Sequence, residues 1–105
     1  MLSLFSTAKD RRQSSRVQMR LSGRGLLPDR SEFAFQVADL SGAGLLATTS
    51  THVPVCSGLV VYLDEIGRLE GDVVRSTSSG FAMSFRITAR KQAQLEGDIA
   101  RLTRR

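Results

Sequence analysis

Between residues 17 and 85 the apolar side chains recur in short alternating runs, and turn-forming residues follow each run. An alternation of period two puts every second side chain on one face of an extended strand, whereas a helix repeats every 3.6 residues. Six such runs follow one another, at residues 17–21, 33–39, 45–48, 58–63, 68–75 and 81–85. Most of the connections have hairpin length, which favours antiparallel neighbours. The pattern predicts an antiparallel meander or a small closed barrel.

Turn-forming residues set the predicted limits of the first two strands. The Ser-Gly-Arg-Gly sequence at residues 22–25 is expected to break the first run, so that residues 22–31 form an extended loop. In the second run, the odd-numbered residues from Phe33 to Asp39 are expected to share one face of the strand.

The last part of the chain changes to a helical period. Thr88 is a suitable N-cap, and good helix formers follow it. Leu95, Ile99 and Leu102 are spaced at i, i+4 and i+7, a narrow apolar stripe that is expected to cover one opening of the barrel. Because Gly97 costs about 1 kcal/mol relative to alanine inside a helix, this helix is expected to depend on docking.

The length and composition favour one small domain. At 105 residues the chain can bury a modest core. We expect a flexible basic arm at residues 1–16, a β-barrel at 17–87 and a helix at 88–105 that packs on the barrel. No apolar run approaches the ~20 residues of a membrane-spanning helix, and the single Cys56 cannot form an internal disulfide. A cytoplasmic protein without membrane insertion is therefore expected.

The net charge of +5 is divided unevenly along the chain. Residues 1–30 carry 7 Lys/Arg against 2 Asp/Glu, residues 31–85 carry 2 against 6, and residues 86–105 carry 6 against 2. A duplex-binding domain usually spreads basic charge over its folded surface. An acidic middle between basic ends indicates a localised anion site instead.

Three arginines are concentrated ahead of the first strand. Arg11, Arg12 and Arg16 fall within six residues, and Asp10 is the only acid nearby. The serines between them are weak helix formers, which favours an arm outside regular structure. Because the planar guanidinium group suits phosphate oxygens and the O6/N7 edge of guanine, we expect this arm to bind an anion with a planar face.

A second polar cluster lies at the predicted turn after the second strand. Asp39, Ser41 and Gly44 supply a carboxylate, a hydroxyl and a glycine that lets the backbone approach a ligand closely. The carboxylate can accept hydrogen bonds from the N1 and N2 groups of guanine. The arginine arm and the turn together suit a ligand that is a negatively charged nucleotide with a guanine base.

A catalytic site is hard to assemble from this sequence. His52 is the only histidine and is expected to be an exposed loop residue, whereas Cys56 is expected to be a small core residue. No spaced pair of cysteines or histidines indicates a metal site, and no nucleophile elbow or phosphate loop is present. We therefore expect a binding protein, not an enzyme, with no catalytic residues, metal or cofactor.

In these features the chain resembles the PilZ family of cyclic di-GMP receptors. The family pattern is Arg-x-x-x-Arg ahead of the first strand and Asp/Asn-x-Ser-x-x-Gly at the turn after the second. The resemblance extends over residues 9–103 and includes the final hairpin. The motif positions are matched here by Arg12, Arg16, Asp39, Ser41 and Gly44.

The resemblance implies a six-stranded antiparallel β-barrel with a C-terminal α-helix. Arg12 and Arg16 would clamp guanine and phosphate groups of cyclic di-GMP, with the Asp39–Gly44 turn beneath the ligand. Arg11, which doubles the first arginine, is a candidate to stack on a second guanine. The family binds cyclic di-GMP as one molecule or as an intercalated pair. A signalling receptor that changes conformation on binding and acts through a protein partner is therefore expected.

Two other functions fit parts of the sequence. A small basic RNA- or DNA-binding barrel would use both charged ends, but 6% aromatic residues and no tryptophan leave few platforms for stacking bases, so nucleic acid is the weaker expectation. A PilZ-like interaction module that has lost its ligand is the third possibility, and the presence of all five motif residues counts against it.

Overall fold

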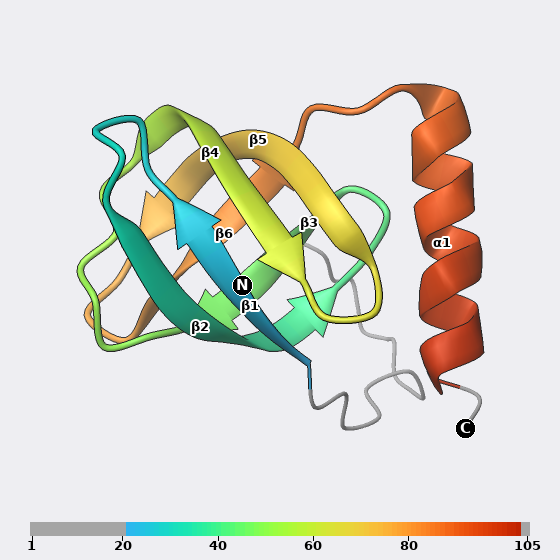
Figure 1. The fold of residues 1–105 in the computed structure, drawn as a ribbon, viewed down its shortest axis with the longest axis horizontal. Helices are drawn as coiled ribbons and strands as arrows, with labels where there is room; N and C mark the ends of the chain where they lie inside the picture. The colour runs from blue at the N-terminus through green and yellow to red at the C-terminus, as the bar shows by residue number, and fades with distance from the viewer. Residues whose placement is uncertain (1–20, 104–105) are drawn as a thin grey trace.

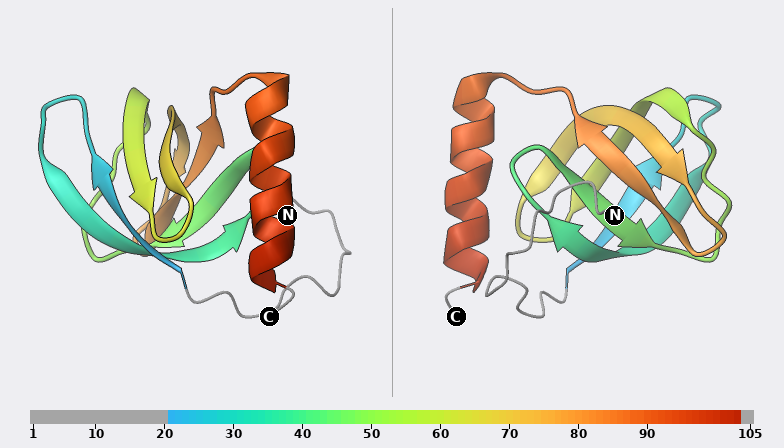
Figure 2. Two further views of the ribbon diagram at one scale, coloured as in Figure 1. Left: turned by 45° about the vertical axis from the view of Figure 1, so that its right-hand side comes forward. Right: turned by 180° about the vertical axis from the view of Figure 1, so that it is seen from behind.

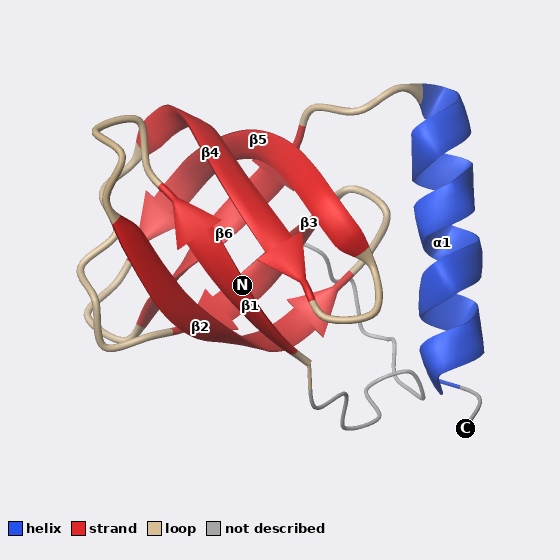
Figure 3. Cartoon of the chain, in the orientation of Figure 1, coloured by secondary structure: helices blue, strands red, loops and turns tan. Residues whose placement is uncertain are grey.

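The computed structural model describes residues 21–103, which form a six-stranded barrel and one helix (Figure 1, Figure 3). The barrel closes in the order β1-β2-β3-β6-β5-β4, and every neighbouring pair is antiparallel. The predicted barrel with a C-terminal helix is confirmed. The elements are β1 (Ser22–Leu26), β2 (Glu32–Leu40), β3 (Gly44–Thr48), β4 (Cys56–Leu63), β5 (Gly67–Ser76), β6 (Gly80–Phe85) and α1 (Ala89–Thr103).

The barrel interior is filled by apolar side chains from all of the strands except β1, and three phenyl rings form its aromatic part. Phe81 packs edge-on against Phe33 and Phe35, with ring centroids 5.7 and 5.6 Å away. All three rings are buried. Edge-to-face contacts of this kind contribute more stability than the burial of their apolar area alone. This cluster therefore joins β2 to β6 across the core.

The first strand differs from the prediction. β1 runs over Ser22–Leu26, where the glycines were expected to break the chain, and the predicted strand at residues 17–21 lies outside the described residues except for Leu21. Gly23 and Gly25 face the core beneath phenyl rings: a Cβ added to Gly25 would lie 2.4 Å from the Phe33 ring. These glycines are strand residues because bulky rings on β2 occupy the space that their side chains would need.

α1 begins at the predicted N-cap and contacts the barrel core through its apolar side chains. The Thr88 hydroxyl accepts a hydrogen bond from the Lys91 amide at 3.1 Å, which is N-cap geometry. Leu95 is buried in the core cluster, and Ile99 and Leu102 pack against that cluster while partly exposed. The predicted stripe is therefore the face by which the helix contacts the barrel. No helix within residues 21–103 has the length and apolar character to cross a membrane.

Several strand ends and turns that could form a binding site lie at one end of the barrel. Here β1 begins, β2 turns into β3, β4 turns into β5, and β6 ends. Figures 1 and 2 show α1 beside this end, next to the β2–β3 and β4–β5 turns. We call it the α1 end. The polar turn and the start of β1 therefore lie at the same end of the barrel.

Candidate functional site

The β2–β3 turn holds the second predicted cluster in a hydrogen-bonded conformation. The Ser41 amide donates to the Gly44 carbonyl at 2.9 Å, and the Ser41 hydroxyl accepts from the Ala43 amide at 3.1 Å. A serine hydroxyl that bonds a backbone amide two residues on stabilises a turn locally. The Ser41 side chain thus holds the turn in one shape and is half-buried at its base.

The turn is also joined to β6. The Phe85 amide donates to the Ala43 carbonyl at 2.8 Å, and Gly44 pairs with Ser84 in the β3–β6 ladder. Gly44 is buried between these strands. The backbone of the turn is therefore fixed from two sides before any ligand arrives.

A β-bulge decides which way Asp39 faces. The β2–β3 register skips Ala38, with Val37 opposite Ala47 and Asp39 opposite Leu46. The extra residue reverses the alternation, so Leu40 points into the core and Asp39 is half-exposed. The prediction that Asp39 shares the face of Phe33 was wrong for this reason. Among residues 21–103, no side-chain hydrogen bond or ion pair engages the Asp39 carboxylate.

The chain enters the barrel beside this turn. The Leu21 carbonyl accepts a hydrogen bond from the Val37 amide at 2.9 Å, two residues before Asp39. Leu21 itself is buried. Arg11, Arg12 and Arg16, the other half of the predicted site, lie outside the described residues. The structure thus places Asp39, Ser41 and Gly44 together and places the attachment point of the arginine segment next to them.

One neighbour of the turn was not predicted from the sequence. Glu96 of α1 lies against Gly42, and a Cβ added to Gly42 would be 2.5 Å from Glu96 Oε2. Gln92, one helical turn earlier, donates to the same carboxylate oxygen at 3.4 Å. Glu96 comes directly after Leu95, the first residue of the apolar stripe, but no sequence pattern predicts its contact with Gly42. The helix therefore brings a second carboxylate to the edge of the candidate site.

The two residues considered for catalysis lie elsewhere. His52 is exposed in the loop between β3 and β4. Cys56 is partly buried and packs against the core, and burial, with a smaller contribution from the Asp72 carboxylate, raises the pKa of its thiol. A raised pKa reduces the thiolate fraction at neutral pH, so Cys56 is a poor nucleophile. Within residues 21–103, no group of three His, Cys, Asp or Glu side chains is arranged to hold a metal ion.

A closed barrel that presents a preformed polar turn at one end has the form of a small binding domain. The family model for the PilZ domain matches residues 10–104, nearly the whole chain. The chain belongs to the PilZ domain family, whose members are binding domains and not enzymes. The match includes the arginine segment and the β2–β3 turn. Comparison with curated proteins gave no match, and comparison with solved structures gave none either.

Proposed function

We propose that this protein is a receptor for cyclic di-GMP, which binds at the α1 end between the arginine segment and the β2–β3 turn. The observation that carries the proposal is that the Asp39–Gly44 motif and the start of β1 lie side by side in a PilZ barrel. Arg12 and Arg16 would contact guanine and phosphate groups. Arg11 would stack on a second guanine if two ligand molecules bind.

Chain length allows the arginines to reach the turn. Arg16 precedes Leu21 by five residues, and an extended chain spans about 3.3–3.6 Å per residue, so its Cα can lie up to roughly 17 Å from Leu21. Because Leu21 is hydrogen-bonded beside Val37, the turn lies within this reach. A half-exposed carboxylate at Asp39 is available to the guanine N1 and N2 donors.

The expected affinity is moderate. Hydrogen bonds to charged groups contribute about 1.5–3 kcal/mol each, and ordering the arm costs ~1–2 kcal/mol per residue that becomes fixed. Four such bonds at the upper value contribute about 12 kcal/mol, and fixing about four residues at ~1 kcal/mol each leaves about 8 kcal/mol, which corresponds to roughly micromolar binding. Ordering the arm over the ligand would change the surface at the α1 end. A cytoplasmic protein partner that binds this changed surface would transmit the signal.

Isothermal titration calorimetry with cyclic di-GMP, and with GTP as the competing nucleotide, tests the proposal. We expect saturable binding of cyclic di-GMP at roughly micromolar concentration, no comparable binding of GTP, and loss of binding in Arg12→Ala and Arg16→Ala. Arg75→Ala is the matched control, because Arg75 is an exposed arginine near the end of β5, at the opposite end of the barrel from the β2–β3 turn.

Two results would count against the proposal. Unchanged affinity in both arm variants would reject the site. Binding to single-stranded oligonucleotides that weakens steeply with salt, without selectivity for cyclic di-GMP, would instead indicate a nucleic-acid-binding barrel.

A further inference from the structure

The outer face of β1, β4 and β5 carries exposed apolar side chains, which a purely solvent-facing surface of the barrel would not need. Within residues 21–103, three large apolar side chains are strongly exposed: Val55, Tyr62 and Val74. Tyr62 lies on β4 and Val74 on β5, and Val55 immediately precedes β4. Val55 and Val74 lie where β4 begins and β5 ends, and Tyr62 lies near the opposite ends of these strands, so all three belong to one strand pair. This strand pair lies across the closed barrel from the β2–β3 pair that holds Asp39.

Strand register arranges the outward side chains of this face in two neighbouring rows. Arg24 on β1 is opposite Tyr62 on β4, and Tyr62 is opposite Arg68 on β5. We call these three residues the basic row. Two residues along the strands, about 7 Å away, the next set of partners forms the acidic row: Glu32, Leu26, Val60 and Glu70.

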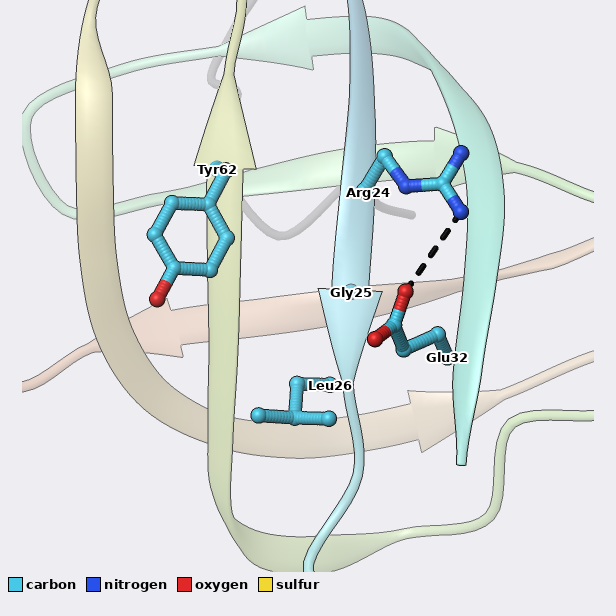
Figure 4. A pocket seen from close by; sticks show the side chains of 5 residues that line it. All are labelled: Arg24, Gly25, Leu26, Glu32 and Tyr62. Atoms are coloured by element: carbon cyan, nitrogen blue, oxygen red, sulfur yellow. Dashed lines mark hydrogen bonds and ion pairs between the residues drawn. The ribbon is translucent and has the colours of Figure 1, made fainter. Parts of the chain in front are cut away.

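The middle of the face is hollowed where the rows meet. Figure 4 shows a pocket between β1 and β4, with the Tyr62 ring on one side and Arg24 with Glu32 on the other. Leu26 and the backbone of Gly25 also line the pocket. Tyr62 is 50% exposed although it stands beside half-buried Leu26 and Val60. An apolar centre of this kind, bounded by charges, is the usual composition of a protein interface.

The charges of the face are balanced, and the pairs in the two rows are loose. Arg24 and Glu32 approach to 3.5 Å, and Arg68 and Glu70 also to 3.5 Å, with exposed side chains in both pairs. Arg86 adds a third cation beside the acids Glu70 and Asp72. A strongly acidic or strongly basic partner would gain little from a face whose charges cancel.

We propose that this face binds a second copy of the same chain through a two-fold axis that runs parallel to the two rows and between them. Such a rotation places the basic row of each copy on the acidic row of the other, which makes the interface isologous. Tyr62 then packs on Val60 of the second copy, Arg68 meets Glu70 of the second copy, and the stem of Arg24 covers Leu26 of the second copy. The two sheets pack face to face with their strands aligned.

Sedimentation velocity of the full chain without nucleotide, over a series of protein concentrations, tests the dimer. We expect a reversible monomer–dimer equilibrium, and a monomer at all concentrations up to about 1 mM would overturn the proposal. Arg68→Glu puts two acids opposite each other, so the dissociation constant should rise about tenfold or more. The double variant Arg68→Glu/Glu70→Arg exchanges both partners and should restore the dimer.

Two further variants separate the interface from folding and net charge. Tyr62→Ala removes an exposed ring without opening the core and should also weaken the dimer about tenfold. Arg90→Glu on α1 makes the same charge change as Arg68→Glu away from this face and should leave the dimer unchanged. A dimer that survives both Tyr62→Ala and Arg68→Glu would place the contact elsewhere and overturn the proposal. Thermal unfolding of each variant verifies that it is folded.

Discussion

The carboxylate of Glu96 on α1 lies directly against Gly42 in the β2–β3 turn, where a side chain on residue 42 would collide with it. Gly42 occupies one of the unspecified positions inside the Asp-x-Ser-x-x-Gly motif. The helix therefore touches the candidate site at a residue that the motif does not define. This contact places a carboxylate of α1 beside the turn at which the proposed anionic ligand would bind.

Replacing Glu96 by glutamine should strengthen cyclic di-GMP binding. A negative charge near the turn repels the phosphates of the ligand, and at separations near 8 Å in water this repulsion amounts to about 0.5 kcal/mol. We expect Glu96→Gln to bind about two- to threefold more tightly in calorimetry at low salt, with the difference shrinking as salt is added. Glu32→Gln, which makes the same charge change at the opposite end of β2, should leave the affinity unchanged.

Glycine-to-alanine substitutions should have opposite effects in the barrel and in the helix. A Cβ on Gly71 would lie 2.0 Å from the Ser84 carbonyl oxygen, and a Cβ on Gly80 would lie 1.9 Å from that of Ala47. Because backbone atoms cannot move aside as a side chain does, either alanine should lower the free energy of unfolding by about 3 kcal/mol. Gly97 has open space around it, so Gly97→Ala should raise this free energy by about 1 kcal/mol. Urea unfolding measures all three, and equal effects at Gly71 and Gly97 would contradict the closeness of β5 and β6.

Asp72 should make stability depend on pH in the acid range. Its carboxylate accepts hydrogen bonds from the Arg86 guanidinium at 2.5 Å and from the Gly58 amide at 3.2 Å. Gly58 has φ +87 at the β4 bulge. The Arg86 hydrogen bond, followed by that from Gly58, lowers the pKa of Asp72 below its unfolded value. Its contribution to stability is therefore present above the unfolded pKa, near 3.9, and is lost as pH falls through the lower folded pKa.

The corresponding measurement is urea unfolding of Asp72→Asn between neutral pH and about pH 3. The variant should be less stable than the parent at neutral pH, and it should lose less stability on acidification. Asp64→Asn, at the exposed β4–β5 turn, makes the same substitution without these two hydrogen bonds and is the matched control. Identical pH profiles for the parent and Asp72→Asn would contradict the assigned role of Asp72.

Local signals carried most of the fold prediction. The last five strands lie within two residues of their predicted limits, and α1 begins after Thr88 as expected. Alternation, turn residues and an N-cap all act over a few neighbouring residues, so the sequence displays them directly. The prediction for the β1 region was wrong because a pair of glycines is typical both of a turn and of a strand that packs closely under bulky side chains. Only the rings of Phe33 and Phe35, which lie eight residues after Gly25 and twelve after Gly23, decide between the two.

The candidate site also combines local features, which the sequence predicts, with long-range contacts, which it does not. Asp39, Ser41 and Gly44 were predicted at the turn, because the motif is local and Ser41 bonds its own loop. The outward direction of Asp39 depends on the bulge at Ala38, which has no sequence signature of its own. The approach of Glu96 to Gly42 joins residues far apart in the chain, and only the docked helix creates it. The roles of Arg11, Arg12 and Arg16 stay predictions, since these residues lie outside the described part of the chain.

The location of the ligand can be measured most directly by two-dimensional NMR of the ¹⁵N-labelled full chain during titration with cyclic di-GMP. We expect the amide signals of residues 10–21 and of the Asp39–Gly44 turn to shift together and to saturate at the concentration that calorimetry gives. The signals of Val74 and Arg75, on the outer face of β5 at the opposite end of the barrel, should stay in place. Shifts confined to that outer face, or an unperturbed Asp39–Gly44 turn at saturating ligand, would contradict binding at the α1 end.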